Sequence, residues 1–221
     1  GLNPLRGILP ESEILSLVDK LQQEGALVNW KNNPDGTRSP YEINVTYLDA
    51  LSLRDSSDDE RIARFILAHA VLLSFPGVPA VYIQSILGSR NDYEGVERLG
   101  YNRAINRKKY TAGQVDLELN NKKSIRYQIY SRLSELIAIR RGERAFHPDS
   151  QAIFDAIGEH ILKIVRVAEN GERMTALFNF SNKMQTVYGQ TLFGTELLSG
   201  QDISGTELTL NPWQVMWIKE N

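Results

Sequence analysis

Cysteine is absent from this sequence of 221 residues. Disulfide bonds, zinc–thiolate sites and thiol nucleophiles are therefore excluded. Histidine is scarce, with 3 residues, and no two of them have the spacing of metal ligands. The sequence also has no glycine-rich phosphate-binding loop and no nucleophile elbow. We therefore expect neither a metal ion nor an organic cofactor.

An excess of charge of one sign is also missing. Lys and Arg number 25 against 27 Asp and Glu, which gives a formal charge of -2. Nothing global attracts such a chain to polyanions or membranes. The longest apolar stretch, residues 65–81, is interrupted by two prolines and two polar residues and is too short to span a bilayer. We expect a cytoplasmic protein that binds neither nucleic acid nor membranes.

Three stretches have the apolar repeat of helices: residues 10–25, 57–75 and 124–142. The second begins with a capping box formed by Ser57 and Glu60. It is apolar on most faces, so we expect it to be buried on more than one side. The first stretch would turn one apolar face to the core, made of Ile14, Leu17, Val18 and Leu21.

The segments between these helices predict an incomplete α/β arrangement. Residues 31–44 are dense in Asn, Pro, Gly and Ser, which predicts a loop. The brief apolar run at residues 78–83 is typical of a buried parallel strand, and residues 88–123 form a long polar insert after it. Because one strand cannot close a sheet, its partner strands must come from elsewhere or from a longer chain.

The pattern changes after Phe146, where alternating apolar and polar residues replace the helical repeat. Two such runs flank Asn170 and Gly171, a pair that favours a tight hairpin turn. Further short runs are separated by Gly, Asn and Pro. Residues 145–221 are therefore predicted to form an antiparallel all-β C-terminal domain.

Residues 101–110, "YNRAINRKKY", concentrate four basic side chains between two tyrosines. A nucleic-acid strip would need a wider basic field than this decapeptide. A solvated surface suits Lys108 and Lys109, whereas Arg103 and Arg107 share one face if the segment is helical. A guanidinium suits rigid binding of hydroxyls, carboxylates or phosphate. The residues alone leave the surface and the binding interpretations open.

Other polar residues were weighed as site candidates. Asn91 and Asp92 follow the expected strand at residues 78–83, on the side where barrel active sites are built. Binding and simple turn formation are equally open for them. The acidic residues 58–60 lie at a helix start, where negative charge is favoured. His69 lies within the apolar helix and is interpreted as a core residue.

Four blocks, "YEINVTYLDAL", "FPGVPAVYI", "NDYE" and "NRAINRKKY", resemble in order and spacing the last part of sucrose phosphorylase and its close relatives in glycoside hydrolase family 13. This resemblance implies an α/β fold: residues 1–144 as the terminal part of a (β/α)8 TIM barrel, and residues 145–221 as the antiparallel domain. It also implies that the chain is a C-terminal fragment, with the N-terminal part of the barrel missing and association with other chains open.

The activity implied by the resemblance is that of a retaining α-glucoside phosphorylase. Such an enzyme transfers glucosyl to inorganic phosphate by double displacement, so its partners are a glucoside and phosphate. The family's three catalytic carboxylates are not in this sequence, so we expect the isolated chain to be inactive. An α-amylase-family hydrolase and a noncatalytic carbohydrate-binding or assembly module are the alternatives.

Carried over residue by residue, the resemblance makes Arg107 an arginine of the glucose pocket and Tyr41 a loop tyrosine that faces phosphate or acceptor. Glu42 stands where sucrose phosphorylase has glutamine, and Ser39 where it has aspartate. Both loop differences argue against sucrose, and "SPYEIN" is similar to relatives that phosphorolyse glucosylglycerate. The expected substrate contacts are thus Tyr41, Glu42, Asn91, Asp92 and Arg107.

Overall fold

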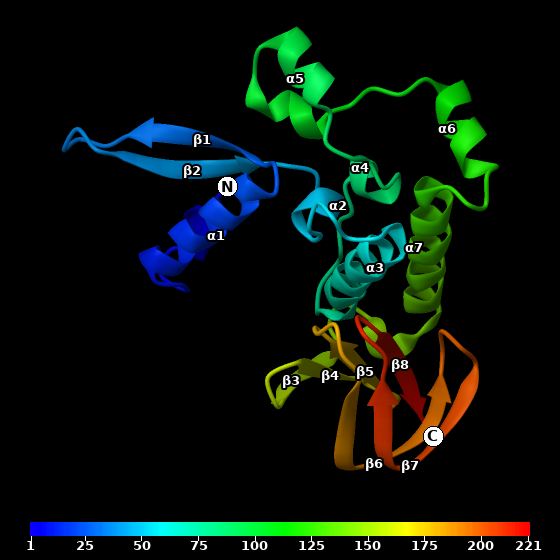
Figure 1. Ribbon diagram of the computed structural model, residues 1–221. Coiled ribbons are helices and arrows are strands. Elements are labelled where there is room, and N and C mark those ends of the chain that lie inside the picture. Colours follow the sequence, from blue (N-terminus) through cyan, green and yellow to red (C-terminus); the bar gives the residue numbers. More distant parts are fainter. The chain divides into compact units, whose positions relative to one another are not determined.

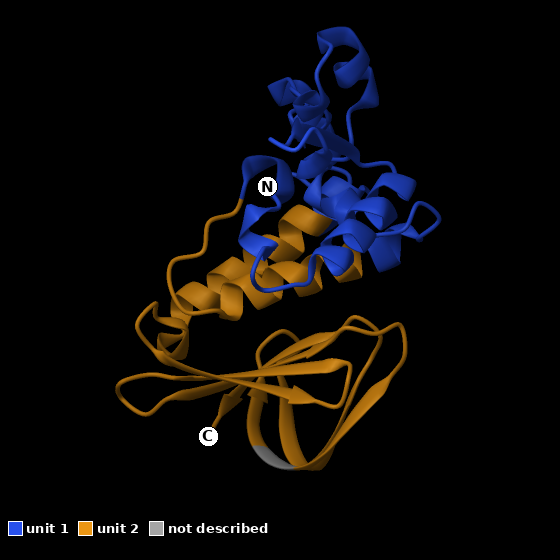
Figure 2. Ribbon diagram, turned by 90° about the vertical axis from the view of Figure 1, so that its left-hand side faces the viewer, with its two compact units in different colours: residues 1–61, 82–128 blue, residues 62–81, 129–221 orange. Residues whose placement is uncertain are grey.

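The computed structural model describes the backbone of residues 1–221 and the side chains of all but residues 190–192. It divides into two compact units, which are described separately (Figure 2). The first consists of Gly1–Arg61 and Tyr82–Gln128, and the second of Ile62–Val81 and Ile129–Asn221. Two helices, α3 (Asp58–Ser74) and α7 (Ile125–Gly142), begin in the first unit and continue in the second.

The first unit starts with a helical turn, η1 (Asn3–Leu5), and the predicted helix, which is α1 (Glu11–Gln23). Two of the four residues expected on its apolar face, Ile14 and Val18, are fully buried. Leu17 is 37% exposed, so the buried face is narrower than predicted. The small core here consists of Leu2, Ile14, Val18 and Val28, with Leu5, Leu9 and Ile43 packed against it.

The loop predicted for residues 31–44 is wrong. Strands β1 (Leu27–Asn32) and β2 (Arg38–Asn44) pair there as an antiparallel hairpin (Figure 1). Asn33, Pro34 and Gly36 lie at its tip, whereas Ser39, Pro40 and Asn44 lie within β2. At the tip Asp35 accepts hydrogen bonds from the backbone N–H and the hydroxyl of Thr37. Each flank gains backbone pairing from the other, which outweighs its weak individual preference for a strand.

Short helices make up most of the rest of the first unit. The 88–123 insert contains α5, η2 and α6, so it is largely helical. Asp92 caps the start of α5, and Thr111 with Gln114 forms a capping box at α6. The bounds are α2 (Tyr47–Ala50), α4 (Ile83–Ile86), α5 (Tyr93–Leu99), η2 (Asn102–Asn106) and α6 (Ala112–Leu119).

The buried parallel strand predicted at residues 78–83 is also wrong. Both sheets in the described chain are antiparallel, and neither includes these residues. Val78 is 84% exposed, and α4 begins at Ile83. A parallel strand forms only beside a partner strand, and no described strand lies next to this segment. The apolar run is therefore extended but unpaired.

The second unit contains the predicted antiparallel sheet, with six strands in the order β3-β4-β5-β8-β6-β7 (Figure 1). The hairpin expected at Asn170 and Gly171 is confirmed, because β4 and β5 pair on either side of it. The strands are β3 (Gln151–Ile157), β4 (Ile161–Val167), β5 (Arg173–Asn179), β6 (Gln185–Glu196), β7 (Gln201–Leu210) and β8 (Val215–Glu220).

A second apolar core lies within this sheet, and most of α3 and α7 and the whole turn η3 (Arg144–Phe146) belong to the same unit. Trp217 of β8 is fully buried and donates its indole N–H to Ser74 Oγ at 3.0 Å. The capping interaction predicted at α3 is present, since Ser57 Oγ accepts from the backbone N–H of Glu60. Among the helices that the structure describes, none has the length and apolar character needed to cross a membrane.

Candidate functional site

The β1–β2 hairpin carries two of the expected substrate contacts, Tyr41 and Glu42. Side chains alternate along β2, so Pro40 is buried whereas Tyr41 is 36% exposed. Glu42 is half-buried and lies opposite Asn29 in the hairpin register. Asn29 Nδ2 donates a hydrogen bond of 2.8 Å to Glu42 Oε2. The hairpin therefore orients this carboxylate through its own register.

The basic decapeptide, residues 101–110, is fixed beside this hairpin. Arg103 Nε donates to both carboxylate oxygens of Glu42, at 3.0 Å each. Asn102 Nδ2 donates to Asn29 Oδ1 at 2.8 Å, so a second contact joins the same two segments. One basic side chain of the stretch is therefore neutralised by a hairpin carboxylate, and it is not available to bind a polyanion.

The contact between Arg103 and Glu42 changes the protonation equilibrium of both groups. Partial burial favours the neutral form of Glu42, but hydrogen bonds from Arg103 and Asn29 outweigh it and hold the pKa of Glu42 below its ordinary value. The same bond raises the pKa of Arg103. Both groups are therefore charged at neutral pH.

Arg107 lies just after η2, and its backbone N–H donates to the carbonyl of Ala104 at 3.0 Å. Ala104 and Ile105 are buried and anchor this turn. On the other side, Gln84 Nε2 donates to the Lys108 carbonyl at 2.8 Å. Among the side chains that the structure describes, none forms a hydrogen bond or ion pair with the exposed Arg107 guanidinium. Its backbone is held while its charged group stays available to a ligand.

Asn91 and Asp92 are used in local structure. Asn91 donates its backbone N–H to Asp49 Oδ2 at 2.7 Å and accepts from the Thr46 N–H at 2.8 Å. Asp92 is buried and accepts from the Gly95 N–H at 3.2 Å as the cap of α5. These are the bonds expected of turn formers. Contact of either residue with a substrate stays a prediction.

A cavity of about 260 Å³ lies beside the Arg107 turn. Its lining includes Tyr47, Tyr82, Gln84 and Asn106, the residue that precedes Arg107. Phenols, amides and a hydroxyl are groups that bind sugar hydroxyls by hydrogen bonds. None of the described residues that line it is a carboxylate, so this cavity has no acid or base for glycoside cleavage.

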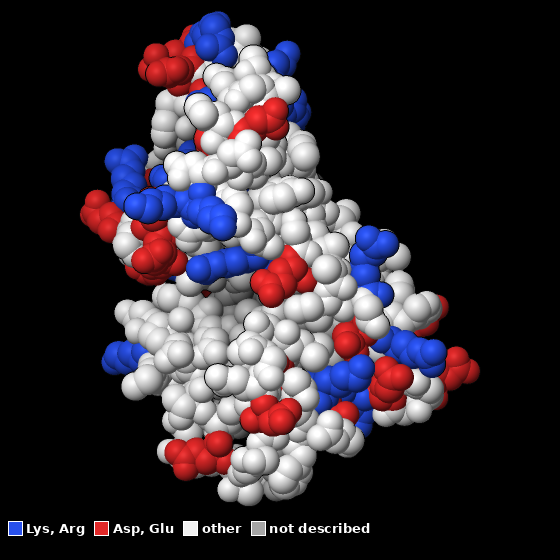
Figure 3. Space-filling model, turned by 90° about the vertical axis from the view of Figure 1, so that its right-hand side faces the viewer, with Lys and Arg blue, Asp and Glu red and all other residues white. Residues whose placement is uncertain are grey.

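The charged and metal-ligating side chains near the site limit the kinds of ligand that it can bind. Within the described part of the chain, no group of three or more His, Asp and Glu residues is placed to hold a metal ion. Basic and acidic side chains are mixed on the face drawn in Figure 3. What remains are hydrogen-bond donors, phenols and guanidinium groups, which suit hydroxylated or anionic small molecules.

The sequence left the role of Arg103 open and predicted that Glu42 contacts the substrate, so the ion pair between the two was not foreseen. No local pattern indicates this pair, because the two residues lie 61 positions apart. The contact of Glu42 with Asn29 follows from the hairpin register, which could not be used while residues 31–44 were interpreted as a loop. A second cluster, in which Asp49 contacts Arg61 and Arg90, was missed because Arg90 lies 41 positions from Asp49.

No family model matches the chain. Among curated proteins, it is 65% identical over 219 residues to glucosylglycerate phosphorylase of Escherichia coli, an alignment that covers 99% of this chain and 39% of the relative. It is 34% identical over 122 residues to sucrose phosphorylase of Agrobacterium vitis, covering 55% of this chain and 22% of that protein. The chain thus spans about two fifths of the length of the first of these relatives.

The fold is similar to that of a solved structure, sucrose 6F-phosphate phosphorylase from Thermoanaerobacter thermosaccharolyticum. The TM-score is 0.67 at 20% identity, and the match covers 91% of this chain and 37% of that one. At this identity the likeness concerns the fold alone. The match covers 91% of the chain, which is more than either compact unit contains, so it includes residues of both units.

Proposed function

Because this chain belongs to the family of the glucosylglycerate and sucrose phosphorylases, in glycoside hydrolase family 13, we propose that it forms part of a retaining α-glucoside phosphorylase. The observation that carries this proposal is the 65% identity over 99% of the chain to a glucosylglycerate phosphorylase. The reaction would transfer a glucosyl group to inorganic phosphate and release glucose 1-phosphate.

For the substrate, we propose glucosylglycerate rather than sucrose. The identity to the glucosylglycerate phosphorylase of Escherichia coli is far above the 34% found for the sucrose phosphorylase. Ser39 and Glu42, on the hairpin that would face the acceptor, support the same choice. Glu42 is bound to Arg103, so a change of residue at this position alters the charge balance of the loop.

We also propose that residues 1–144 are the last part of a (β/α)8 barrel and residues 145–221 its C-terminal domain. In that arrangement the unpaired apolar segment at residues 78–83 would pack against parts of the barrel that are not in this chain. The exposure of Val78 (84%) and Tyr82 (54%) supports this, because exposed apolar groups close together in sequence are usually covered by a partner surface.

The mechanism implied for the enzyme is a double displacement. One carboxylic acid protonates the glycosidic oxygen while a carboxylate attacks the anomeric carbon, so the glycosidic bond breaks, glycerate leaves and a covalent glucosyl ester forms. Phosphate then attacks the same carbon and gives a proton back to the first carboxylate. The ester bond breaks and the α configuration is restored. We assign neither carboxylate to a residue of this chain.

The residues of this chain would bind and orient the reactants. Arg107 would donate hydrogen bonds to a glucosyl hydroxyl, and the absence of a described side chain bonded to its guanidinium supports that role. Tyr41 would contact phosphate or glycerate from the hairpin. Glu42 and Arg103 would set the position of that hairpin, and Asn91 and Asp92 would hold the turn before α5.

The test is phosphorolysis by a polypeptide that contains this chain within the full length of its relatives. Glucosylglycerate and phosphate should yield glucose 1-phosphate, and sucrose should be a poor substrate under the same conditions. Release of free glucose at a rate independent of phosphate would contradict the proposal and favour the hydrolase alternative.

Substitution of Arg107 tests the assigned role within that enzyme. We expect Arg107→Gln to lower kcat/KM about 10- to 100-fold, because a charged hydrogen bond to the substrate contributes about 1.5–3 kcal/mol. Lys109→Gln is the matched control, since it removes a nearby exposed charge without a proposed contact. Equal losses in the two variants would refute a specific role for Arg107.

A further inference from the structure

Three arginines from different elements line one cavity of about 390 Å³ in the first unit. Arg54 comes from the turn after α2, Arg61 from the start of α3, and Arg90 from the segment before α5. Two carboxylates, Asp49 and Glu24, also line the cavity. The charge of these five side chains therefore sums to a positive value, although the chain as a whole is slightly acidic.

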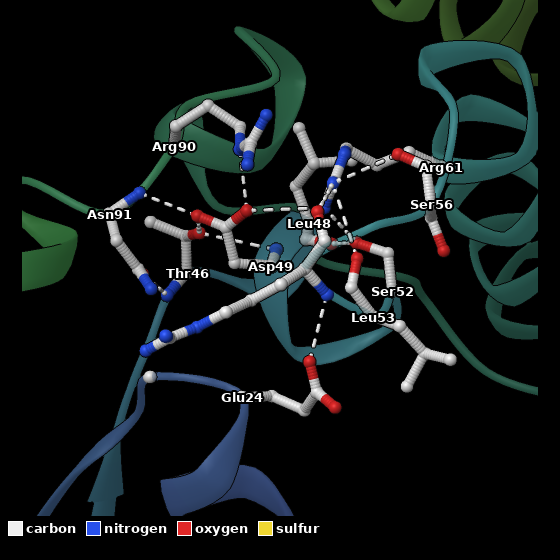
Figure 4. A network of polar contacts seen from close by, with 12 residues as sticks. Glu24, Thr46, Leu48, Asp49, Ser52, Leu53, Ser56, Arg61, Arg90 and Asn91 are labelled. Carbon is white, nitrogen blue, oxygen red and sulfur yellow. Dashed lines mark hydrogen bonds and ion pairs between the residues drawn. The ribbon is translucent and has the colours of Figure 1, made fainter.

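The carboxylate of Asp49 is already fully used by protein donors (Figure 4). Its Oδ1 accepts from Arg90 Nε at 2.5 Å and lies 3.5 Å from Arg61 Nη1. Its Oδ2 accepts from the Asn91 N–H at 2.7 Å and from the Thr46 hydroxyl at 3.1 Å. With both oxygens engaged, Asp49 has no oxygen left to bind a further cation in the cavity.

Arg61 is 3% exposed and organises the turn from which Arg54 projects. Its Nη2 donates to the carbonyls of Leu53, Arg54 and Ser56, and its Nη1 donates to Ser52 Oγ. Its Nε is buried and has no hydrogen-bond partner among the described residues. Burial lowers the pKa of Arg61, and the charge of Arg90 acts in the same direction, whereas Asp49, Asp58 and Glu60 act against it.

Arg54 carries the positive charge that remains at the cavity once Asp49 and Glu24 are counted against the three arginines. Its backbone N–H donates to Glu24 Oε2 at 2.8 Å, so that carboxylate is engaged by the main chain. Its guanidinium is exposed and forms no hydrogen bond or ion pair with any side chain that the structure describes. Arg90 uses Nε for Asp49, and no described residue accepts from its two Nη groups. Two guanidinium groups at one cavity therefore have N–H donors to offer.

We propose that this cavity binds a small phosphate group, as inorganic phosphate or as a phosphate monoester. Planar guanidinium groups match the oxygens of phosphate with paired hydrogen bonds. The volume of about 390 Å³ lies in the range of small-molecule sites and has room for a group attached to the phosphate. Arg54 and Arg90 bind the ligand, and Arg61 is a positioning residue. The inference does not rest on the proposed function, because it concerns binding without turnover.

The experiment is calorimetric titration of the 221-residue chain with inorganic phosphate, sulfate and a hexose phosphate. Saturable binding of phosphate or the hexose phosphate is expected, and the tighter of the two identifies whether the attached group contributes. Arg54→Gln should weaken it about 10-fold or more. Its guanidinium forms no hydrogen bond or ion pair with a described side chain, so this variant should keep the circular dichroism and melting temperature of the parent. Arg98→Gln, which removes an exposed charge from the last turn of α5, should leave binding unchanged.

Two results would overturn the proposal. One is the absence of saturable heat with inorganic phosphate and with the hexose phosphate. The other is an unchanged dissociation constant in Arg54→Gln. Arg107→Gln should bind phosphate as the parent does; loss of binding there, with Arg54→Gln unaffected, would assign the phosphate to the Arg107 turn and refute this site.

Discussion

Single contacts decide which charges of this chain are available to a ligand. Glu42 is held by Arg103 and Asn29, whereas no described side chain bonds to the guanidinium of Arg107, four residues after Arg103. The pairing is partly exposed, with 49% of the Arg103 side chain accessible, so its contribution to stability is small. Its structural effect is larger, because it links the hairpin to η2.

The Glu42 carboxylate should make a measurable acid-range contribution to stability. Its pKa is lowered from 4.5 in the folded chain, so the stabilisation is present above about pH 4.5 and is lost as pH falls through the lower folded value. Glu42→Gln should cost less than about 1 kcal/mol at pH 7 and less again at pH 3, where the carboxylate is increasingly protonated. Urea unfolding at both pH values measures this. Glu97→Gln, on the exposed side of α5, is the control and should show neither effect.

His69 should make the free energy of unfolding depend on pH in a second, higher range. It is 2% exposed and its Nδ1–H donates to the Phe65 carbonyl at 2.9 Å. Burial lowers its pKa below 6.5, and that hydrogen bond offsets only part of the effect. The unfolded chain then takes up the proton first, so stability is full above about pH 6.5 and falls as pH decreases below it.

His69→Gln should remove that decrease, measured as the change in unfolding free energy between about pH 7.5 and 5.5. His160→Gln, at an exposed position, should keep it. A decrease of the same size in His69→Gln and the parent would contradict the assignment. The burial of His69 was predictable from the sequence, because this residue lies amid the apolar residues of a helical repeat.

The contacts of Glu42 were not predictable. Its contact with Asn29 depends on a strand register, and its contact with Arg103 joins residues 61 positions apart.

At the scale of elements, helices could be predicted from local sequence, whereas strands depend on the strands beside them. Helices α1, α3 and α7 were predicted, because a helix satisfies its own backbone and its apolar repeat marks the buried side. The β1–β2 hairpin was missed and the strand at residues 78–83 was wrongly predicted for one reason. Strand formation depends on the neighbouring strand, which residues 31–44 have and residues 78–83 lack in this chain.

The end of α3 depends on two buried arginines rather than on a cap residue. Arg140 donates to the carbonyls of Leu73 and Gly77, and Arg166 donates to the Ser74 carbonyl at 2.8 Å. No carboxylate of the described residues pairs with Arg166. The carbonyls at a helix C-terminus carry partial negative charge and take the place of a counter-ion.

Arg166→Met should therefore destabilise the second unit by about 3 kcal/mol or more, because it leaves buried carbonyls without donors. Besides Ser74, the carbonyls of His147 and Ser150 accept from Arg166. Arg173→Met on the neighbouring strand, where the ion pair to Glu220 is 46% exposed on the arginine side, should cost less than about 1 kcal/mol. Chemical unfolding of both variants checks the difference; equal costs would contradict the capping role.

At the scale of the whole molecule, the resemblance carried by four short blocks predicted the family, and physical pattern alone did not. Periodicity indicates an apolar run but not whether a strand pairs with it. The run at residues 78–83 is present but unpaired among the described strands, with Val78 and Ile83 largely exposed. Exposed apolar groups of this kind are covered by a partner surface in most proteins.

The last prediction concerns turnover by the 221 residues alone. Glycosyl transfer with retention needs an acid and a nucleophile, usually two carboxyl groups about 5–5.5 Å apart on either side of the bond. The cavity beside Arg107 has no carboxylate among its described lining residues, and Glu42 is bound to Arg103. We expect no glucose 1-phosphate above background when the chain is incubated with phosphate and glucosylglycerate. Turnover comparable to that of a full-length relative would refute this and would require an acid and a nucleophile within these residues. Asp92 would then be the first to substitute, since it is buried and adjoins Asn91 in the same turn.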